Sequence, residues 1–207
     1  LCDAMAFDDL TGLSCKLIPL FSKYPKARLE LRTKTTTVEN LLNIEPTDNI
    51  VVSWTFSPQV IIDNHEHKAP SLEERLRAAV DVQNAGYIVG ICLDPIILCD
   101  GWFDHYKTML EKIIERLDME SVRFISLGGF RYLPSLSKVI KERDPQTNLL
   151  LSEFVPCVDG KHRYFRPIRV EAYKEIGTVI RELNKDVKIS LCMETPEVWN
   201  SVKDVLK

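Results

Sequence analysis

The sequence lacks a hydrophobic run long enough to cross a lipid bilayer. Its longest apolar run, Tyr87 to Leu93, falls well short of the ~20 residues that a membrane-spanning helix needs. An excess of basic residues is also missing, since 27 Lys and Arg face 30 Asp and Glu and give a net charge of −3. We therefore expect no membrane partner, and no nucleic-acid binding that depends on a global positive charge.

Closely spaced cysteines and glycine-rich phosphate loops are absent as well. No two of the six cysteines lie two or three residues apart, so the C-x-x-C patterns of zinc sites and iron–sulfur clusters are missing and we expect no metal site. Neither G-x-G-x-x-G nor a P-loop motif occurs, which disfavours nucleotide-binding folds built on those loops. Scattered cysteines in a chain of this length indicate a reduced, cytoplasmic protein.

What the sequence does contain is an alternation of strand and helix patterns. Apolar or alternating runs predict strands over 28–33, 49–55, 87–93, 122–127 and 187–192. Helical patterns lie between and after them, at 9–23, 38–42, 71–86, 100–117, 134–140, 170–183 and 195–206. Repeated β-then-α units predict an α/β fold with a parallel sheet, either a barrel or an open doubly wound sheet. We expect the first four strands to be adjacent in chain order, with helices on one side.

Several local signals predict where these elements begin and end. Ser71 and Glu74 form a capping box at the start of a helix, and Asp100 is suited to cap a later one. Asp94-Pro95 is expected to end the strand 87–93. Residues 148–151 are a short strand candidate, and 153–167 are expected to be irregular.

Polar residues follow or end four of the predicted strands. They are Lys34, Ser53, Asp94 and the loop Gly128–Arg131. Because chemistry in parallel α/β folds collects at the carboxyl ends of the strands, these residues predict one shared pocket. Two other segments carry less weight: His65-Glu66-His67 is interpreted as a solvated loop, and the basic-aromatic run 161–166 fits either a phosphate- and base-binding segment or a solvated basic loop.

Several short segments, taken in order, carry a resemblance to a known family. They are CDAMAFDDLT at 2–11, LRTK at 31–34, SWT at 53–55, AGYIVG at 85–90, DPI at 94–96 and GW at 101–102. With this order and spacing the sequence resembles the spore photoproduct lyase family, whose members are radical S-adenosylmethionine proteins related to DNA repair. The similarity runs from residue 2 to about 130 and continues more loosely from Asp159-Gly160-Lys161 to Leu191-Cys192-Met193-Glu194.

The resemblance implies a partial parallel (β/α) barrel of the radical S-adenosylmethionine type that lacks its first strands and has C-terminal β/α additions. Residues 1–145 would form the later part of the barrel, and 146–207 an extension packed on it. The sequence begins at Leu1 without a methionine, so we expect a fragment whose cluster-binding cysteines lie upstream. S-adenosylmethionine and a [4Fe-4S] cluster would then belong to the full-length protein, with neither bound by this chain alone. DNA or another nucleic acid would be the substrate, and an exposed sheet edge would favour association.

The resemblance also assigns roles to individual residues. Lys34 and Ser53 match residues that contact S-adenosylmethionine, and Cys2 and Asp3 match a pair near the same cofactor. Asp94 is also expected near the cofactor, at a position where the lyases have a small residue. Three further residues are expected on the substrate side, namely Arg131, Arg163 and Tyr164.

Two alternatives stay open from the sequence. One is a complete small (β/α) barrel hydrolase or aldolase, which would use a convergent acid and base such as Asp94 and Glu194. The other is a noncatalytic nucleic-acid-binding module that uses residues 161–169, against which the net negative charge counts.

Overall fold

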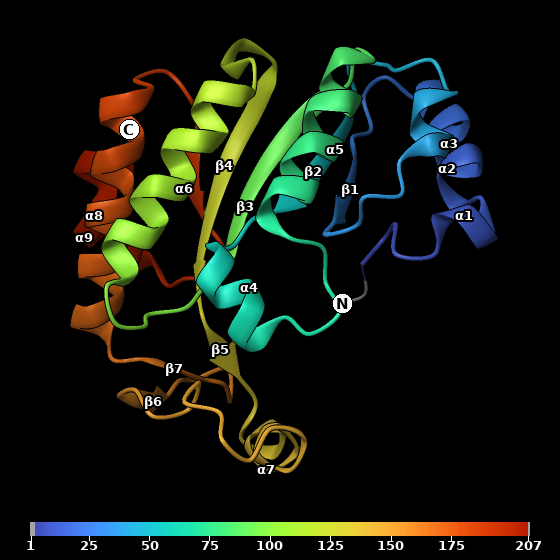
Figure 1. Cartoon of the computed structure of the whole chain (residues 1–207). Coiled ribbons are helices and arrows are strands. Elements are labelled where there is room, and N and C mark those ends of the chain that lie inside the picture. The colour runs from blue at the N-terminus through green and yellow to red at the C-terminus, as the bar shows by residue number, and fades with distance from the viewer. Residues whose placement is uncertain (1–2, 207) are drawn as a thin grey trace.

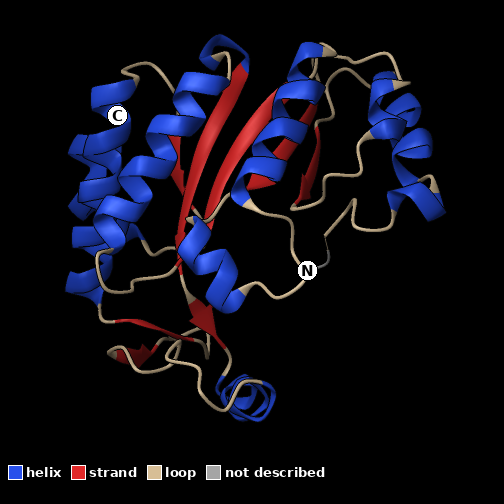
Figure 2. Cartoon of the chain, in the orientation of Figure 1, coloured by secondary structure: helices blue, strands red, loops and turns tan. Residues whose placement is uncertain are grey.

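The computed structural model describes residues 3–206, and its centre is a parallel sheet (Figures 1 and 2). The strands lie in the spatial order β1 (Leu29–Thr33), β2 (Ile50–Thr55), β3 (Ile88–Ile96), β4 (Val122–Gly129) and β8 (Ile189–Leu191). Every neighbouring pair is parallel. The expected order and direction of the first four strands are therefore confirmed. The strand β8, from the segment expected to be an extension, joins this same sheet.

The helices flank the sheet in chain order. They are α1 (Asp8–Thr11), α2 (Leu13–Ser22), α3 (Glu39–Leu42), α4 (Gln59–His65), α5 (Leu72–Asn84), α6 (Trp102–Arg116), α7 (Pro134–Arg143), α8 (Arg166–Leu183) and α9 (Pro196–Leu206), with a short 3₁₀ turn at Met119–Ser121. Figure 1 shows α5 and α6 in front of the sheet, α8 and α9 beside them, and α1 to α3 next to β1. Within the described residues, none of these helices is long and apolar enough to cross a membrane.

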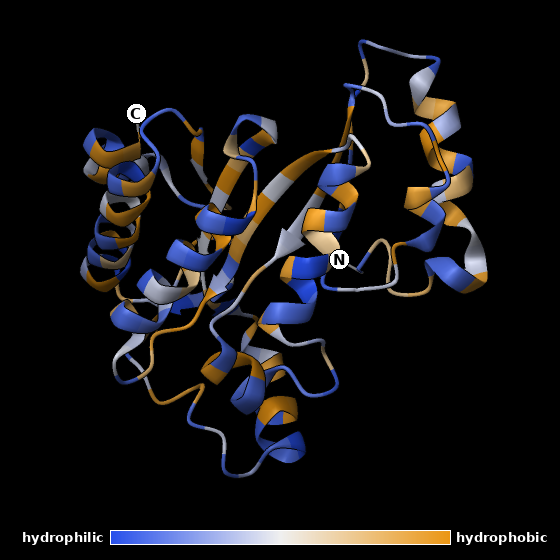
Figure 3. Ribbon diagram, turned by 45° about the horizontal axis from the view of Figure 1, so that its top comes forward, coloured by the Kyte–Doolittle hydropathy of each residue, from blue (hydrophilic) through white to orange (hydrophobic). Residues whose placement is uncertain are grey.

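The helix α5 illustrates how the sequence builds this layer. The hydroxyl of Ser71 accepts a hydrogen bond from the backbone N–H of Glu74, and the Glu74 carboxylate accepts one from the backbone N–H of Ser71. This capping box satisfies backbone donors that the first turn leaves free. Leu72 and Leu76 of this helix are buried in the core, so the amphipathic pattern fixes which face is buried. Figure 3 shows hydrophobic and hydrophilic residues alternating along the helices.

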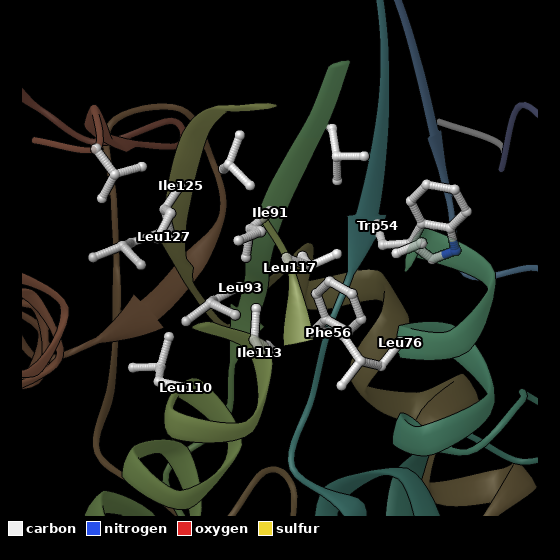
Figure 4. Packing of buried hydrophobic residues seen from close by; sticks show 14 of the residues in the cluster. Trp54, Phe56, Leu76, Ile91, Leu93, Leu110, Ile113, Leu117, Ile125 and Leu127 are labelled. Carbon is white, nitrogen blue, oxygen red and sulfur yellow. The ribbon is translucent and has the colours of Figure 1, made fainter. Parts of the chain in front are cut away.

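One face of the sheet packs against the helices and forms the core. Alternate strand residues such as Trp54, Ile91 and Ile125 are fully buried there and meet apolar side chains from α5 and α6 (Figure 4). Burying each such side chain contributes about 1.5–3 kcal/mol. We call this the helix-covered face.

The opposite face, which we call the polar face, carries small and polar residues. The parallel register places Arg32 beside Ser53 and Ser53 beside Gly90. A Cβ atom on Gly90 would lie only 2.8 Å from the Phe124 ring and 2.9 Å from Ser53 Cβ, so glycine is required by close approach. The small and polar residues of the polar face are Glu30, Arg32, Ser53, Thr55, Gly90, Cys92, Asp94, Ser126 and Gly128, and Val51 and Phe124 are apolar residues on the same face.

A second, small sheet lies beyond the carboxyl ends of the long strands (Figure 1). It is antiparallel, in the order β5 (Arg131–Tyr132), β7 (His162–Tyr164) and β6 (Phe154–Pro156). The prediction that 153–167 is irregular is therefore wrong, and so is the prediction of a strand at 148–151. Aromatic packing explains why β6 and β7 form, since the Phe154 and Tyr164 rings stack with centroids 4.6 Å apart.

Two of the expected element boundaries are also wrong. The strand β3 continues through Asp94-Pro95 to Ile96, because its register with β4 shifts between Leu93 and Ile96 and such irregularities tolerate a missing donor. The helix α6 has Gly101 rather than Asp100 as its N-cap, with no side-chain capping bond.

Candidate functional site

A cavity of about 540 Å³ opens at the carboxyl ends of the strands. It brings together four of the expected site residues, Asp3, Lys34, Asp94 and Arg131. Cys2, which was expected beside Asp3, lies outside the described residues. The remaining wall residues are Arg32, Thr33, Thr55, Pro95, Phe130, Tyr132, Leu133, Leu136, Lys161 and Met193. We call this the central pocket.

Asp3 is fixed against the end of β1. Its carboxylate accepts hydrogen bonds from the Lys34 backbone N–H at 2.7 Å, the Thr33 hydroxyl at 2.7 Å and the Met5 backbone N–H at 2.9 Å. The neighbouring Ala4 N–H donates to the Arg32 carbonyl at 3.1 Å. The segment that precedes α1 therefore covers part of the outer edge of β1 and holds an acid at the pocket.

Lys34 follows β1 and reaches a carboxylate that the sequence analysis missed. Its Nζ lies 2.9 Å from Glu66 Oε1. The other Glu66 oxygen lies 2.5 Å from the guanidinium of Arg75, which is completely buried, and the Ser57 hydroxyl donates to Glu66 at 2.7 Å. Burial alone would raise the pKa of Glu66, but Lys34 and Arg75 outweigh it, so this pKa lies below its ordinary value.

A signal for Glu66 was present in the sequence. Arg75 falls between Leu72 and Leu76 on the apolar face of α5, and a guanidinium placed in the core requires a carboxylate partner. The prediction that 65–67 is a solvated loop is wrong for Glu66, because the Glu66 side chain is only 8% exposed. A third of the Lys34 side chain remains exposed, and Lys34 lines the central pocket.

Asp94 lies in the continuation of β3 and is held by two arginines. Arg131 donates to both carboxylate oxygens, at 2.7 and 3.2 Å, and Arg32 Nη1 lies 3.8 Å away. Gly128 of β4 makes room for this carboxylate, since a Cβ there would lie 2.6 Å from Asp94 Oδ1. Arg131 Nη1 also donates to the Gly129 carbonyl, and Nη2 contacts Cys192 Sγ and Met193 Sδ.

Ser53 does not end its strand and does not line the central pocket. It is fully buried on the polar face, and its hydroxyl donates to Glu30 Oε1 at 2.6 Å. The strand β2 runs on to Thr55, and Thr55 occupies the wall position instead. The expected placement of Ser53 at a strand end is wrong for this reason.

Arg163 and Tyr164 lie in β7, and both are buried. The Arg163 guanidinium pairs with Asp159 through two contacts, 2.6 and 2.8 Å long, and this bidentate hydrogen bonding lowers the pKa of Asp159. The Tyr164 hydroxyl accepts a hydrogen bond from the Leu98 backbone N–H at 3.2 Å. Burial raises the pKa of Tyr164 to about 12. Neither side chain lines the central pocket.

Glu194, the expected partner of Asp94 in a hydrolase, has a different role. Its side chain is 2% exposed and accepts hydrogen bonds from Arg169 at 2.9 Å and from the Tyr173 hydroxyl at 2.8 Å. The Tyr173 hydroxyl also accepts from the Gly129 backbone N–H at 2.7 Å. This network fixes the end of β4 beside the pocket, and Glu194 does not converge with Asp94 on a shared reacting group.

The cysteines that the structure describes do not gather into a site. Within residues 3–206, no three histidine, cysteine or acidic side chains are grouped closely enough to hold a metal ion. Cys92 lies on the polar face, where burial raises the pKa of its thiol to about 12. Burial and the nearby Asp94 carboxylate likewise raise the pKa of the Cys192 thiol.

The central pocket combines charged and apolar side chains. Its cations are Arg32, Lys34, Arg131 and Lys161, and its carboxylates are Asp3 and Asp94. Its apolar and aromatic side chains include Phe130, Tyr132, Leu133 and Leu136, from β5, α7 and the residues next to them. Such a site suits a ligand that carries both charged groups and a flat or apolar group.

Comparison with known proteins shows the family of the chain. A family model described as spore photoproduct lyase matches residues 1–175. Among curated proteins, the chain is similar to the spore photoproduct lyases of Clostridium acetobutylicum, with 25% identity over 151 residues, and of Bacillus subtilis, with 28% identity over 153 residues. Each alignment covers 73% of this chain and 45% of the relative, so the chain spans about half the length of the curated relatives it matches.

Solved structures show the same fold. A spore photoproduct lyase mutant with bound AdoMet and dinucleoside spore photoproduct matches with a TM-score of 0.81 and 22% identity, covering 91% of this chain and 57% of that one. The lyase complexed with dinucleoside spore photoproduct gives the same values. These neighbours support the parallel α/β architecture of a partial barrel, and the family model covers most of the sequence. The chain therefore belongs to the spore photoproduct lyase family.

Proposed function

We propose that this chain forms the cofactor- and substrate-binding part of a radical S-adenosylmethionine enzyme similar to spore photoproduct lyase. The observation that carries the proposal is the convergence of Asp3, Lys34 and Asp94 on one cavity at the strand ends. The fold of the family and the bound AdoMet in one solved relative support it.

The charges of the central pocket fit the amino-acid end of S-adenosylmethionine. The Lys34 ammonium pairs with Glu66 at 2.9 Å and retains N–H groups for the cofactor carboxylate, and Arg32 lies nearby. Asp3 and Asp94 would supply acceptors for the cofactor ammonium and ribose hydroxyls. When bound in the full-length enzyme, the cofactor supplies hydrogen-abstraction chemistry. The residues of this chain bind and orient it.

An iron–sulfur cluster does not fit the described part of this chain. Its ligands must be thiolates in one constellation, and the free cysteines described, at 15, 92, 99, 157 and 192, lie on separate elements. We assign no cluster to residues 3–206. The free thiols support a reducing, cytoplasmic setting.

We propose a nucleic acid as the substrate, by analogy with the lyase complexed with dinucleoside spore photoproduct. The aromatic wall of the pocket suits a base. Arg131 would contact the substrate from the pocket wall, and Arg163 and Tyr164 would act from β7 by holding the small sheet in position. Association through the outer edge of β1 would depend on how much of that edge the segment at Asp3 leaves open.

Substitution of Lys34 in the complete protein, reconstituted with its cluster, tests the proposal. We expect Lys34→Ala to weaken S-adenosylmethionine binding by about 10- to 100-fold, because a charge-assisted hydrogen bond contributes ~1.5–3 kcal/mol. Lys34→Arg should retain part of the affinity. Anaerobic calorimetric titration measures both, with Lys138→Ala on the exposed face of α7 as the matched control. An unchanged affinity in Lys34→Ala would overturn the assignment of this pocket.

A further inference from the structure

Met193 has a backbone conformation that side chains rarely adopt. Its φ angle is 54°, and Lys68, with φ 65°, is the other non-glycine residue with positive φ among residues 3–206. For a residue with a long side chain this conformation is unfavourable, and it persists where surrounding contacts impose it. The Met193 side chain is 49% exposed and lines the central pocket.

Contacts on both sides of Met193 impose this conformation. The preceding residue, Cys192, donates its backbone N–H to the Leu127 carbonyl at 2.7 Å. The following residue, Glu194, is clamped by the buried Arg169 and by Tyr173. The Met193 carbonyl itself accepts a hydrogen bond from Arg163 at 3.3 Å. These contacts hold the backbone of residues 192–194 on both sides of Met193 and at Met193 itself. They therefore fix the position of the exposed Met193 thioether.

The thioether shares the pocket wall with a cation and with aromatic and aliphatic side chains. Its Sδ is 3.4 Å from Arg131 Nη2. Tyr132 and Leu136 line the same cavity. Met193 lies beyond residues 1–175, the part that the family model matches.

We infer that Met193 is a ligand-contact residue whose thioether packs against the flat ring of a purine or pyrimidine in the central pocket. A polarizable sulfur beside an aromatic wall favours a ring over an aliphatic chain, because sulfur–aromatic contacts are favourable. The inference rests on the proposed function, which supplies two sources of such a ring: the adenine of the cofactor and a base of the substrate. The strained backbone fixes where the ring lies.

A nuclear magnetic resonance titration of the complete protein tests the contact directly. The methionines are labelled with ¹³C in their methyl groups, and Met193→Leu assigns the Met193 signal. An aromatic ring stacked on the thioether shifts that methyl resonance upfield through its ring current. Adenosine and thymidine are titrated separately, and free methionine serves as a charged ligand without a ring.

We expect one of the nucleosides to shift Met193 more than Met5, Met109 and Met119, and free methionine to leave it nearly unchanged. A shift with adenosine alone assigns the cofactor ring, and a shift with thymidine alone assigns the substrate base. If neither nucleoside shifts Met193 more than the other methyl groups, the inference is wrong. The Lys34 titration in the complete protein would still stand, so the two failures are distinguishable.

A second measurement separates ligand contact from a structural role. Met193→Gly relieves the positive φ and removes the thioether, so the melting temperature should stay the same or rise while nucleoside affinity falls about twofold to tenfold. Lys68→Gly is the matched control, because Lys68 has the same kind of φ but does not line the central pocket. It should gain stability without losing affinity. Equal affinities for the two glycine variants would contradict the inference.

Discussion

Glu66 and Asp94 are two carboxylates that are each held between two cations, and their partners lie in different places. Glu66 lies between Lys34, which lines the central pocket, and Arg75 of α5, whose side chain is completely buried. Asp94 lies between Arg131 and Arg32, and both of these arginines line the pocket. The two carboxylates are similarly covered, with side chains 8% and 10% exposed.

The difference separates an anchoring ion pair from one that a ligand can reach. Arg75 also donates to the Pro70 and Thr55 carbonyls, so removing Glu66 leaves a buried guanidinium with no ionic partner. Arg131 and Arg32 keep access to solvent and to any ligand in the cavity when Asp94 is removed. The same pattern of charges therefore supports the scaffold in one case and shapes the pocket in the other.

The largest effect is expected for Glu66→Gln. Breaking a buried ion pair by neutralising one partner typically costs about 3–5 kcal/mol, and retention of the Gln hydrogen bonds places this variant near the lower value. Urea denaturation at pH 7 measures the loss in the free energy of unfolding. The control is Glu73→Gln, which removes an exposed pair with Arg116 and should cost less than ~1 kcal/mol.

The same pair predicts a pH dependence with a definite sign. Because the folded-state pKa of Glu66 lies below its ordinary value, its stabilisation is fully present above the unfolded pKa of ~4.3 and is lost as the pH falls through the folded pKa. The stability difference between the parent chain and Glu66→Gln should be constant from pH 6 to pH 8 and shrink below about pH 4. A difference that grows in acid would show that Glu66 is not the paired carboxylate.

A smaller effect is expected for Asp94→Asn. Arg131 loses a bidentate partner but keeps the Gly129 carbonyl and some exposure, so the cost should be about 1–2 kcal/mol. Urea denaturation beside Glu66→Gln sharpens the comparison between the two carboxylates. A loss for Asp94→Asn as large as that for Glu66→Gln would show that Asp94 also anchors the scaffold.

The smallest effect is expected for Ser53→Ala. Its hydroxyl makes one hydrogen bond, to Glu30, which also accepts from Arg32, so the cost in unfolding free energy should be about 0.5–1.5 kcal/mol. S-adenosylmethionine affinity of the complete protein should fall by less than about tenfold, because Ser53 is buried and acts only through its neighbours. A larger loss of affinity would place Ser53 in direct contact with the cofactor.

The parallel sheet could be predicted from the sequence because its strands are apolar runs separated by helical patterns. Even so, the run Tyr87 to Leu93 conceals two unlike faces. Ile91 is packed under the helices, and the neighbouring Cys92 and Gly90 lie on the polar face. Small and apolar residues indicate that both faces of this strand are buried, and both are. They do not show that the neighbours across one of the two faces are polar.

The rest of the site depends on contacts between residues far apart in the chain. The strands β5, β6 and β7 have only two or three residues each, which is too short for a periodic pattern. They are held by aromatic pairs such as Tyr132 and His162, 30 residues apart. Lys34 and Asp94 could be predicted because a strand end is a local feature. The pairing of Glu66 with Arg75 could have been predicted only by asking which acidic residue neutralises the guanidinium on the apolar face of α5.

The central pocket also has a consequence for how fast a ligand arrives. Its wall carries two more positive than negative side chains, whereas the whole chain carries a net charge of −3. A positive cavity in an acidic molecule concentrates field lines at its opening and steers anions toward it, while the remaining surface repels them. Association of an anionic ligand should therefore slow as ionic strength rises, because the Debye length shrinks to ~8 Å at physiological salt. The net charge of the chain therefore does not show the local attraction that the central pocket exerts on an anionic ligand before the two are in contact.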